Sequence, residues 1–414
     1  MFNSIKINTW RQFEKIDINF HPRLTILTGA NGAGKTTILN LLSQHYGWPT
    51  QLVGTPKKDK KTGHLKFLSG IWKSLFESEK ESDQQPKEIG YIIYANGQKC
   101  LMLIPNIVGS TYNVDFQGQQ GIRGIHIPSH RPIYKYQAVQ NIPTQLVSKQ
   151  NAFNQYKNTS VQRYHGNRVE HSENYYIKET LISLATFGYG NQAITRNDEA
   201  IRLYEGFENI LRIVLPPKLG FQKFLIRIPE VILETTSGEF SLDAVSGGIA
   251  SIIDLAWQIF MFDDSSGSFT ITFDEPENHL HPEMQKTLLP NFLTAFPQTQ
   301  FIIASHNPFI ISSVPDSNVY VLNYSNDNRV QSLLLKDIEK SGSANDILRE
   351  VLGIETTMPN WVDRKLEIII SKYAETGITA ENLTAFKAEL KTIGLEKCVS
   401  TSVANLLEKS KKND

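Results

Sequence analysis

The stretch Gly29-Ala30-Asn31-Gly32-Ala33-Gly34-Lys35-Thr36 fits the pattern G-x-x-x-x-G-K-[ST] at every position, and the expected fold follows from it. Residues 23–28 form a short, apolar and β-branched run that is typical of a buried strand, and residues 37–42 continue as a helix. A strand, a glycine-rich turn and a helix in this order predict a loop that binds the phosphates of a nucleoside triphosphate.

Each residue type in this loop has a physical task. The glycines permit backbone conformations closed to residues with a Cβ, so successive N–H groups can face the phosphates. The N-terminus of the helix adds its partial positive charge. Lys35 is expected to reach the β- and γ-phosphates, and the Thr36 hydroxyl to coordinate Mg²⁺. The expected nucleotide-binding positions here are Gly29, Ala30, Asn31, Gly32, Ala33, Gly34, Lys35, Thr36 and Thr37.

Length and composition limit the classes of protein that the chain can belong to. Its 414 residues leave room for two or three domains, and a net charge of zero gives no global attraction to nucleic acid or anionic membrane. Cys100 and Cys398 stand far apart, without metal or redox spacing, which fits a reducing compartment. The sequence shows no signal peptide and no apolar run of about 18 to 20 residues. We therefore expect a cytoplasmic protein that has no membrane partner.

Hydrophobic patterning divides the chain into four expected parts. Residues 1–129 form a first lobe with the phosphate-binding loop and an antiparallel β subdomain, which has a hairpin turn at Asn96-Gly97. Residues 130–221 predict a helical insertion, with helices at 175–187 and 199–215. Residues 222–337 predict a second α/β lobe. Residues 338–414 predict a helical C-terminal region that ends in a disordered tail at 409–414. The charge run at 56–61 predicts an exposed basic loop.

A second strand, at residues 269–274, ends in two adjacent acids. Adjacent carboxylates at a strand end are what a Mg²⁺-dependent hydrolase needs. Asp274 would hold the metal, directly or through water, and Glu275 would polarise the attacking water. The expected metal ligands are therefore Thr36 and Asp274.

Two further segments suit a triphosphate. Residues 301–304 predict a strand that leads to His306, and a histidine at that position could hydrogen-bond the γ-phosphate. Ser246, Gly247 and Gly248 precede a helix predicted at 251–261, so they offer a hydroxyl and bare backbone donors to an anion.

In this order, the phosphate-binding loop, the Ser-Gly-Gly turn, the acidic strand and the strand-tip histidine resemble the ATP-binding-cassette (ABC) ATPase family. The sequence Asp274-Glu275-Pro276-Glu277-Asn278-His279-Leu280-His281-Pro282 is similar to its soluble RecF/SMC-like branch, which includes the ATPases of OLD-type and related anti-phage systems. The resemblance covers residues 1–50 and 222–337 and touches 343–354 and the helices after them. It implies an α/β fold: a P-loop ABC-type ATPase head with an antiparallel β subdomain, a helical insertion and a helical C-terminal tail.

The resemblance also implies ATP and Mg²⁺ as cofactors and a role for each matching residue. Lys35, Glu275 and His306 form the catalytic set, with Glu275 as the base and His306 as the switch. Ser246, Gly247 and Gly248 act in trans on ATP held by a partner subunit, so ATP joins two head-to-tail copies of the chain. Leu280-His281 lie in the loop that contacts the partner.

Three features depart from the family pattern. Val245 and Ile249 stand where the family favours Leu and Gln, which predicts weaker closure of the dimer. No aromatic residue is clearly placed to stack on adenine. The glutamine that couples the two lobes has several candidates, namely Gln117, Gln120, Gln137 and the segment Ser129-His130-Arg131.

Two functions remain open from the sequence. The first rests on the resemblance to that branch: the chain is the sensor or regulatory ATPase of a prokaryotic anti-phage system. Its nuclease effector would be a separate protein, because no Asp-x-Asp of a fused nuclease follows His306. The second is a DNA-binding clamp for repair or chromosome maintenance, which would grip phosphates with Lys57 to Lys61, Arg163 and Arg168. A transporter motor is disfavoured by the residues that follow Glu275.

Overall fold

The computed structural model describes residues 1–48, 50–58, 63–69, 86–105, 107–130, 134–143, 147–336, 342–353, 359–375, 379–392 and 394–395. The predictions made for Lys60, Lys61, Arg131 and residues 409–414 lie outside the described residues. The chain divides into two compact units, Met1–Ile347 and Leu348–Asp414. The first unit contains every residue that the sequence predicts to bind nucleotide.

The first unit is built on one large mixed sheet, which confirms the α/β fold class. Within the described residues this sheet has 11 strands in the order β11-β8-β7-β1-β2-β19-β18-β3-β17-β16-β12. The parallel part consists of β12 (Gly124–Ile127), β16 (Phe269–Asp274), β17 (Thr299–Ala304), β3 (Leu24–Gly29) and β18 (Asn318–Tyr324). The remaining strands are β1 (Phe2–Ile7), β2 (Phe13–Asn19), β7 (Lys87–Tyr94), β8 (Lys99–Ile104), β11 (Asp115–Gln117) and β19 (Val330–Leu334).

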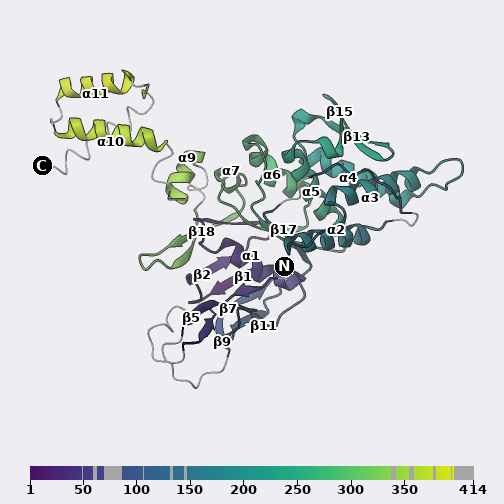
Figure 1. Cartoon of the computed structure of the whole chain (residues 1–414), viewed down its shortest axis with the longest axis horizontal. Helices are drawn as coiled ribbons and strands as arrows, with labels where there is room; N and C mark the ends of the chain where they lie inside the picture. The colour runs from purple at the N-terminus through teal and green to yellow at the C-terminus, as the bar shows by residue number, and fades with distance from the viewer. Residues whose placement is uncertain are drawn as a thin grey trace. The chain divides into compact units, whose positions relative to one another are not determined.

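The central strands are buried on both faces. Every residue of β3, β16 and β17 is buried, as the continuous apolar and β-branched runs in their sequences predict. Helix α1 (Lys35–Ser43) packs against all three strands (Figure 1). Gly29 ends β3 with φ 131°, and a Cβ there would lie 2.3 Å from the carbonyl oxygen of Leu322 on β18. Glycine is therefore required where the phosphate-binding loop leaves the sheet.

Three helices make up most of residues 130–221, where the sequence predicts a helical insertion: α2 (Lys149–Tyr164), α3 (Glu173–Tyr189) and α4 (Asp198–Val214). The sequence pattern predicted α3 and α4 to within two residues at each end. It missed α2, because that helix lies in a polar stretch and buries only a narrow stripe that includes Phe153 and Tyr156. Both α2 and α4 pack against α5 (Gly247–Phe262), as Figure 1 shows.

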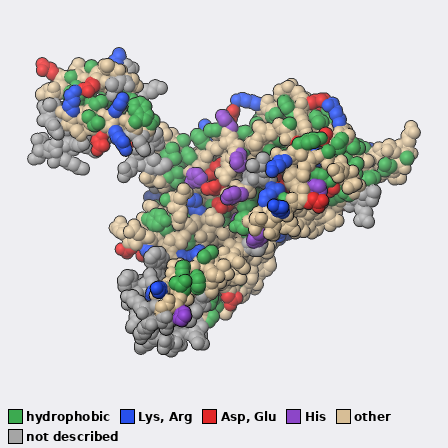
Figure 2. All heavy atoms as spheres, viewed as in Figure 1, with side chains coloured by type: hydrophobic (Ala, Val, Ile, Leu, Met, Phe, Trp, Pro, Cys, Tyr) green, Lys and Arg blue, Asp and Glu red, His purple; other side chains and the backbone are tan. Residues whose placement is uncertain are grey.

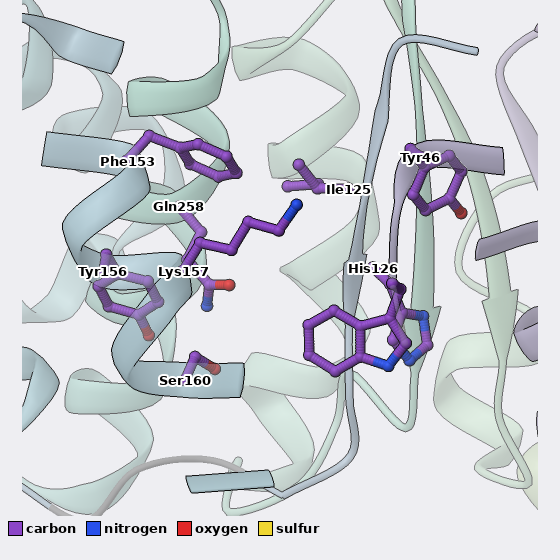
Figure 3. Close-up of a pocket in the computed structure, with 9 residues that line it drawn as sticks. Tyr46, Ile125, His126, Phe153, Tyr156, Lys157, Ser160 and Gln258 are labelled. Carbon is purple, nitrogen blue, oxygen red and sulfur yellow. The ribbon is translucent and has the colours of Figure 1, made fainter. Parts of the chain in front are cut away.

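A small hollow remains where α2 meets the sheet, and Figure 3 shows the Lys157 ammonium group pointing into it. Its walls consist of Tyr46, Trp48, Ile125, His126, Phe153, Tyr156, Lys157, Ser160 and Gln258. Burial lowers the pKa of Lys157. The Nδ1 atom of His126 lies 2.9 Å from Oγ1 of Thr272, so one wall of the hollow is tied to β16.

Residues 56–58, the described part of the predicted exposed basic loop at 56–61, are mostly exposed as predicted, but they form a strand and not a loop. Thr55–Lys58 form strand β5, which pairs with β6 (Leu65–Leu68) and lies at the edge of a three-stranded sheet completed by β9 (Ile107–Val108). Proline and lysine are common on edge strands, where they block pairing with other chains. The charge run therefore marks an edge strand here.

The other described elements are short or peripheral. The strands are β4 (Leu52–Val53), β10 (Thr111–Tyr112), β13 (Phe221–Arg227), β14 (Glu230–Thr235) and β15 (Gly238–Ser241). The short helices and turns are η1 (Gln44–Tyr46), η3 (Pro217–Leu219), η4 (Leu242–Ala244), α7 (Pro308–Ile311), α9 (Ala344–Asp346) and η5 (Ile347–Val351). Helix α6 (Pro282–Ala295) precedes β17. The sequence did not predict β15, because this strand is short, polar and mostly exposed.

The second unit contains α10 (Asn360–Glu375) and α11 (Ala380–Thr392). The apolar side chains of α10, namely Leu366, Ile369, Ile370 and Tyr373, pack with Phe386 and Leu390 of α11. No helix in the described part of either unit has the length and apolar character that a membrane crossing requires.

The aromatic contact between α4 and α5 leads to a prediction about stability. Phe207 is fully buried, and its ring centroid lies 4.9 Å from that of Trp257. Phe207→Ala is expected to lower the free energy of unfolding by about 3–5 kcal/mol, because it leaves a cavity among aromatic rings. The half-exposed Ile213 on the same helix provides a control, and Ile213→Ala should change stability by less than about 0.5 kcal/mol. Urea unfolding measures both, and equal shifts of the midpoint would contradict the assignment.

Candidate nucleotide-binding site

The predicted phosphate-binding loop forms a turn that leads directly into α1. Gly34 is the N-cap of α1 with φ 95°, and a Cβ there would lie 2.4 Å from Cζ of Phe13. The side chain of Lys35 turns back over the loop, and its Nζ donates hydrogen bonds to the carbonyl oxygens of Gly29 at 2.8 Å and Ala30 at 3.2 Å. Lys35 is buried, and this burial lowers its pKa even though nearby carboxylates act in the opposite direction. The loop thus places a poorly solvated cation beside backbone donors.

The structure brings the two predicted metal ligands together. The Thr36 hydroxyl donates a hydrogen bond to Oδ2 of Asp274 at 2.9 Å, although 238 residues separate them in the sequence. Mg²⁺ prefers hard oxygen ligands and usually takes one or two from the protein, with water and phosphate completing the shell. A hydroxyl and a carboxylate at this spacing fit that requirement, so Thr36 and Asp274 could hold Mg²⁺.

Glu275 and His306 also lie side by side, at the ends of β16 and β17. Nδ1 of His306 is 3.3 Å from Oε1 of Glu275. Glu275 has φ 46°, a left-handed conformation that is uncommon for a residue with a side chain, and its N–H donates to the carbonyl of Ala304 at 2.8 Å. The Asn278 amide donates to Oε2 of Glu275 at 3.2 Å and to the carbonyl of Ser129 at 3.1 Å. Both the backbone and the carboxylate of Glu275 are therefore held in place.

The sequence did not reveal the hydrogen-bonded pair Ser305 and Glu277, which supports His306. The Ser305 hydroxyl donates to Oε1 of the buried Glu277 at 2.6 Å and accepts a hydrogen bond from the Asn307 N–H at 3.0 Å. The Asn307 amide donates to Oε1 of Gln285 on α6 at 2.8 Å. Burial raises the pKa of Glu277. The two residues that flank His306 are thus fixed to the loop and helix that follow β16.

The Ser-Gly-Gly turn lies at the N-terminus of α5, next to the loop that follows β16. Ser246 is the N-cap of α5, its side chain is exposed, and its hydroxyl makes no cap hydrogen bond. A Cβ on Gly248 would lie 3.1 Å from the carbonyl oxygen of His279, so the turn packs against the loop after β16. Leu280 in that loop is buried, while His281 accepts a hydrogen bond from the Glu283 N–H and caps α6.

The candidates for the glutamine that couples the two lobes differ in the contacts that they make. Oε1 of Gln137 accepts hydrogen bonds from Ser172, and Oε1 of Gln120 accepts one from Asn96. Ser129, just after β12, offers its carbonyl to Asn278 beside Glu275. This contact favours Ser129 over Gln120 and Gln137. Figure 2 shows histidine and acidic side chains gathered near the middle of the face that it draws.

Comparison with known proteins identifies the family of the chain. A family model described as "AAA domain" matches residues 4–212. A second model, described as "AAA domain, putative AbiEii toxin, Type IV TA system", matches residues 171–312. The chain belongs to the AAA domain family.

Two curated relatives and one solved structure are similar to the chain. The Septu protein PtuA of Bacillus thuringiensis is 20% identical over 380 residues, which cover 88% of this chain and 87% of that protein. The "Retron Vc95 probable ATPase" of Vibrio cholerae serotype O1 biovar El Tor is 29% identical over 80 residues, which cover 18% of this chain and 16% of that protein. The SMC head domain from Thermotoga maritima is 11% identical with a TM-score of 0.37, over 81% of this chain and 99% of that domain. The chain is a distant homologue of the Septu protein and the retron ATPase.

The buried Glu277 leads to a prediction about pH. Its raised pKa means that the folded chain holds this proton more tightly than the unfolded chain, whose ordinary value is 4.5. The stabilisation from Glu277 is therefore present below pH 4.5 and is lost as the pH rises through the pKa of the folded state. The amide of a Glu277→Gln variant cannot titrate, so the free energy of unfolding of the wild type minus that of the variant should fall as the pH rises from 4.5. Urea unfolding across this range measures it, and a constant difference would contradict the assignment.

Proposed function

We propose that the chain binds ATP with Mg²⁺ and hydrolyses it between two copies arranged head to tail. One observation carries this proposal: the pair Thr36–Asp274 and the pair Glu275–His306 meet at the same end of neighbouring parallel strands. The first pair offers oxygen ligands to a metal, and the second offers a base and a γ-phosphate contact. Membership of the AAA domain family supports a nucleoside triphosphate as the ligand.

Each residue has a defined task in this reaction. The backbone N–H groups from Gly29 to Thr37 surround the phosphates, and Lys35 neutralises charge on the β- and γ-phosphates. Mg²⁺, bound through Thr36 and Asp274, would screen the charge that develops on the phosphate oxygens. Glu275 accepts hydrogen bonds that orient the attacking water, while His306 donates to the γ-phosphate. Most of the rate enhancement then comes from position and electrostatics, as in other phosphoryl transfers.

The exposed Ser246 hydroxyl supports a shared site. It lies at the N-terminus of α5, where backbone donors and the helix dipole favour an anion, and it makes no cap hydrogen bond within its own chain. Ser246, Gly247 and Gly248 are therefore suited to contact the γ-phosphate of ATP that is bound to Lys35 of a second copy. ATP would then join the two copies, and hydrolysis would release them.

We further propose that the chain is the sensor or regulatory ATPase of a prokaryotic anti-phage system and controls a separate nuclease. Its relationship to the Septu protein PtuA extends over most of both chains, and a retron ATPase is also related to it. The DNA-clamp alternative has less support from the described residues. Arg163 is engaged in an ion pair with the buried Glu173, so it is not a ready phosphate contact, whereas Lys58 on β5 is exposed.

A substitution of the proposed base should separate binding from turnover. Glu275→Gln keeps the side chain's shape but cannot act as a base, so phosphate release should fall by about 100- to 10,000-fold. ATP binding survives, and the variant should accumulate as an ATP-bound dimer that light scattering detects as a doubled mass. Glu239→Gln, in an exposed ion pair with Arg227, should leave turnover and mass at wild-type values. A mass that ATP does not change, in both the wild type and Glu275→Gln, would refute the shared site.

The defence role predicts a phenotype that depends on the phosphate-binding loop. Bacteria that carry the chain with its neighbouring genes should resist phage, and Lys35→Ala should restore plaque formation to the level of cells without the genes, because ATP no longer binds. Inactivation of a neighbouring nuclease gene should have the same effect. Lys223→Met on the exposed face of β13 is the control, and it should keep the protection. Full protection by the Lys35→Ala variant would exclude an ATP-dependent sensor.

A further inference from the structure

A buried lysine on α3 connects the helical segment to the Ser-Gly-Gly turn. Lys178 is fully buried, and its Nζ lies 2.5 Å from Oδ2 of Asp243 and 3.1 Å from Oε2 of Glu230. It also donates a hydrogen bond to the carbonyl oxygen of Gln137 at 2.5 Å. The carboxylate of Asp243 is almost as deeply buried as the lysine. A buried charge that loses its partner carries a large desolvation cost, so this contact resists separation.

Asp243 stands three residues before Ser246. It lies in η4, and Val245 then continues in an extended conformation to Ser246, the N-cap of α5. A second residue of α3 holds the same carboxylate, because the Asn174 amide donates to Oδ1 of Asp243 at 2.6 Å. Side chains of α3 thus bind both carboxylate oxygens of Asp243, and only two residues lie between Asp243 and Ser246.

The body of α5 is tied to the helical segment in a similar way. The Tyr156 hydroxyl on α2 donates a hydrogen bond to Oδ1 of the buried Asp254 on α5, and Oδ2 of Asp254 accepts one from Gln258. Figure 1 shows α2, α3, α4 and α5 grouped together. Buried polar contacts therefore hold α5 at Asp254 and also hold Asp243 just before the helix, which restrains the direction in which its N-terminus points.

We propose that Lys178 is a positioning residue for the Ser246–Gly248 turn, and that it acts on the nucleotide held by the other copy. This inference rests on the proposed shared site. Backbone donors stabilise developing charge only when they are preorganised within a fraction of an ångström, and a displacement of about 1 Å can cost about 100-fold in rate. Lys178 prevents that displacement. The phosphate-binding loop of its own chain does not depend on it, because Lys35, Thr36 and Asp274 make their contacts on the sheet.

The first test is the variant Lys178→Met, which keeps the length of the side chain and removes its charge. We expect unchanged affinity for a fluorescent ATP analogue, since the phosphate-binding loop is intact, and ATP turnover reduced by about 100-fold. Lys223→Met is the matched control, because Lys223 pairs with Glu234 at 3.4 Å on the exposed face of the neighbouring sheet. It should retain wild-type turnover. Wild-type turnover by Lys178→Met would overturn the inference.

Mixing two inactive variants separates positioning in trans from a general structural defect. Lys35→Ala lacks a phosphate-binding loop that functions but keeps its Ser246 turn, whereas Lys178→Met keeps the loop but lacks a positioned turn. In a mixed dimer one site combines the intact loop of one copy with the intact turn of the other. An equal mixture should therefore recover ATP turnover that neither variant shows alone. Ser246→Arg mixed with Lys35→Ala is the reference, because it removes the turn directly.

The outcomes distinguish the inference from the function on which it rests. Recovery in both mixtures supports the positioning role. Recovery in the reference mixture alone overturns the role of Lys178 and leaves the shared site intact. No recovery in the reference mixture refutes the shared site, and the inference fails with it. If circular dichroism shows that Lys178→Met does not fold, the nearly isosteric Asp243→Asn replaces it in both measurements, with the same expected and contradicting results.

Discussion

The register of three parallel strands is the constraint on which the site depends. Asp274 on β16 pairs with Ala304 on β17, and Ala304 pairs with Leu27 on β3, so β16 and β17 end in one row and β3 continues two residues beyond it to Gly29. The residues that follow this row are polar and meet at one edge of the sheet. A shift of one residue in any strand would turn its side chains to the opposite face and separate Thr36 from Asp274. Every residue of these strands is buried, so a shift would disturb the packing on both faces of the sheet.

The site is also defined by low polarity around its charges. Burial lowers the pKa of Lys35 and raises that of Glu277, so desolvation disfavours the charged form of both groups. A surrounding of this kind strengthens electrostatic interactions, which is useful where the charge of a triphosphate must be neutralised. The same property makes each buried charge depend on its partner, as with Lys178 and Asp243. The low polarity around buried charges therefore favours both the neutralisation of a triphosphate and the rigidity of the unit.

Local sequence patterns predicted much of the fold because they follow local rules. The hairpin turn at Asn96-Gly97, which joins β7 and β8, and the helices predicted at 175–187 and 199–215 were all confirmed. The errors arose where tertiary packing overrides local preference. Thr55–Lys58 became an edge strand because β6 supplies a partner, and α2 formed in a polar stretch because α5 covers its narrow apolar stripe.

The sequence by itself determined that the chain has a glycine-rich loop between a buried strand and a helix, and which residue types could bind a metal or polarise water. These properties depend on residues within about one turn or one strand of each other. The tertiary structure decided that Thr36 contacts Asp274, that Asn278 and His306 hold Glu275, and that α3 fixes the residue three positions before Ser246. These contacts join segments that are far apart in the chain, so they follow from how strands and helices pack. No spacing in the sequence encodes them.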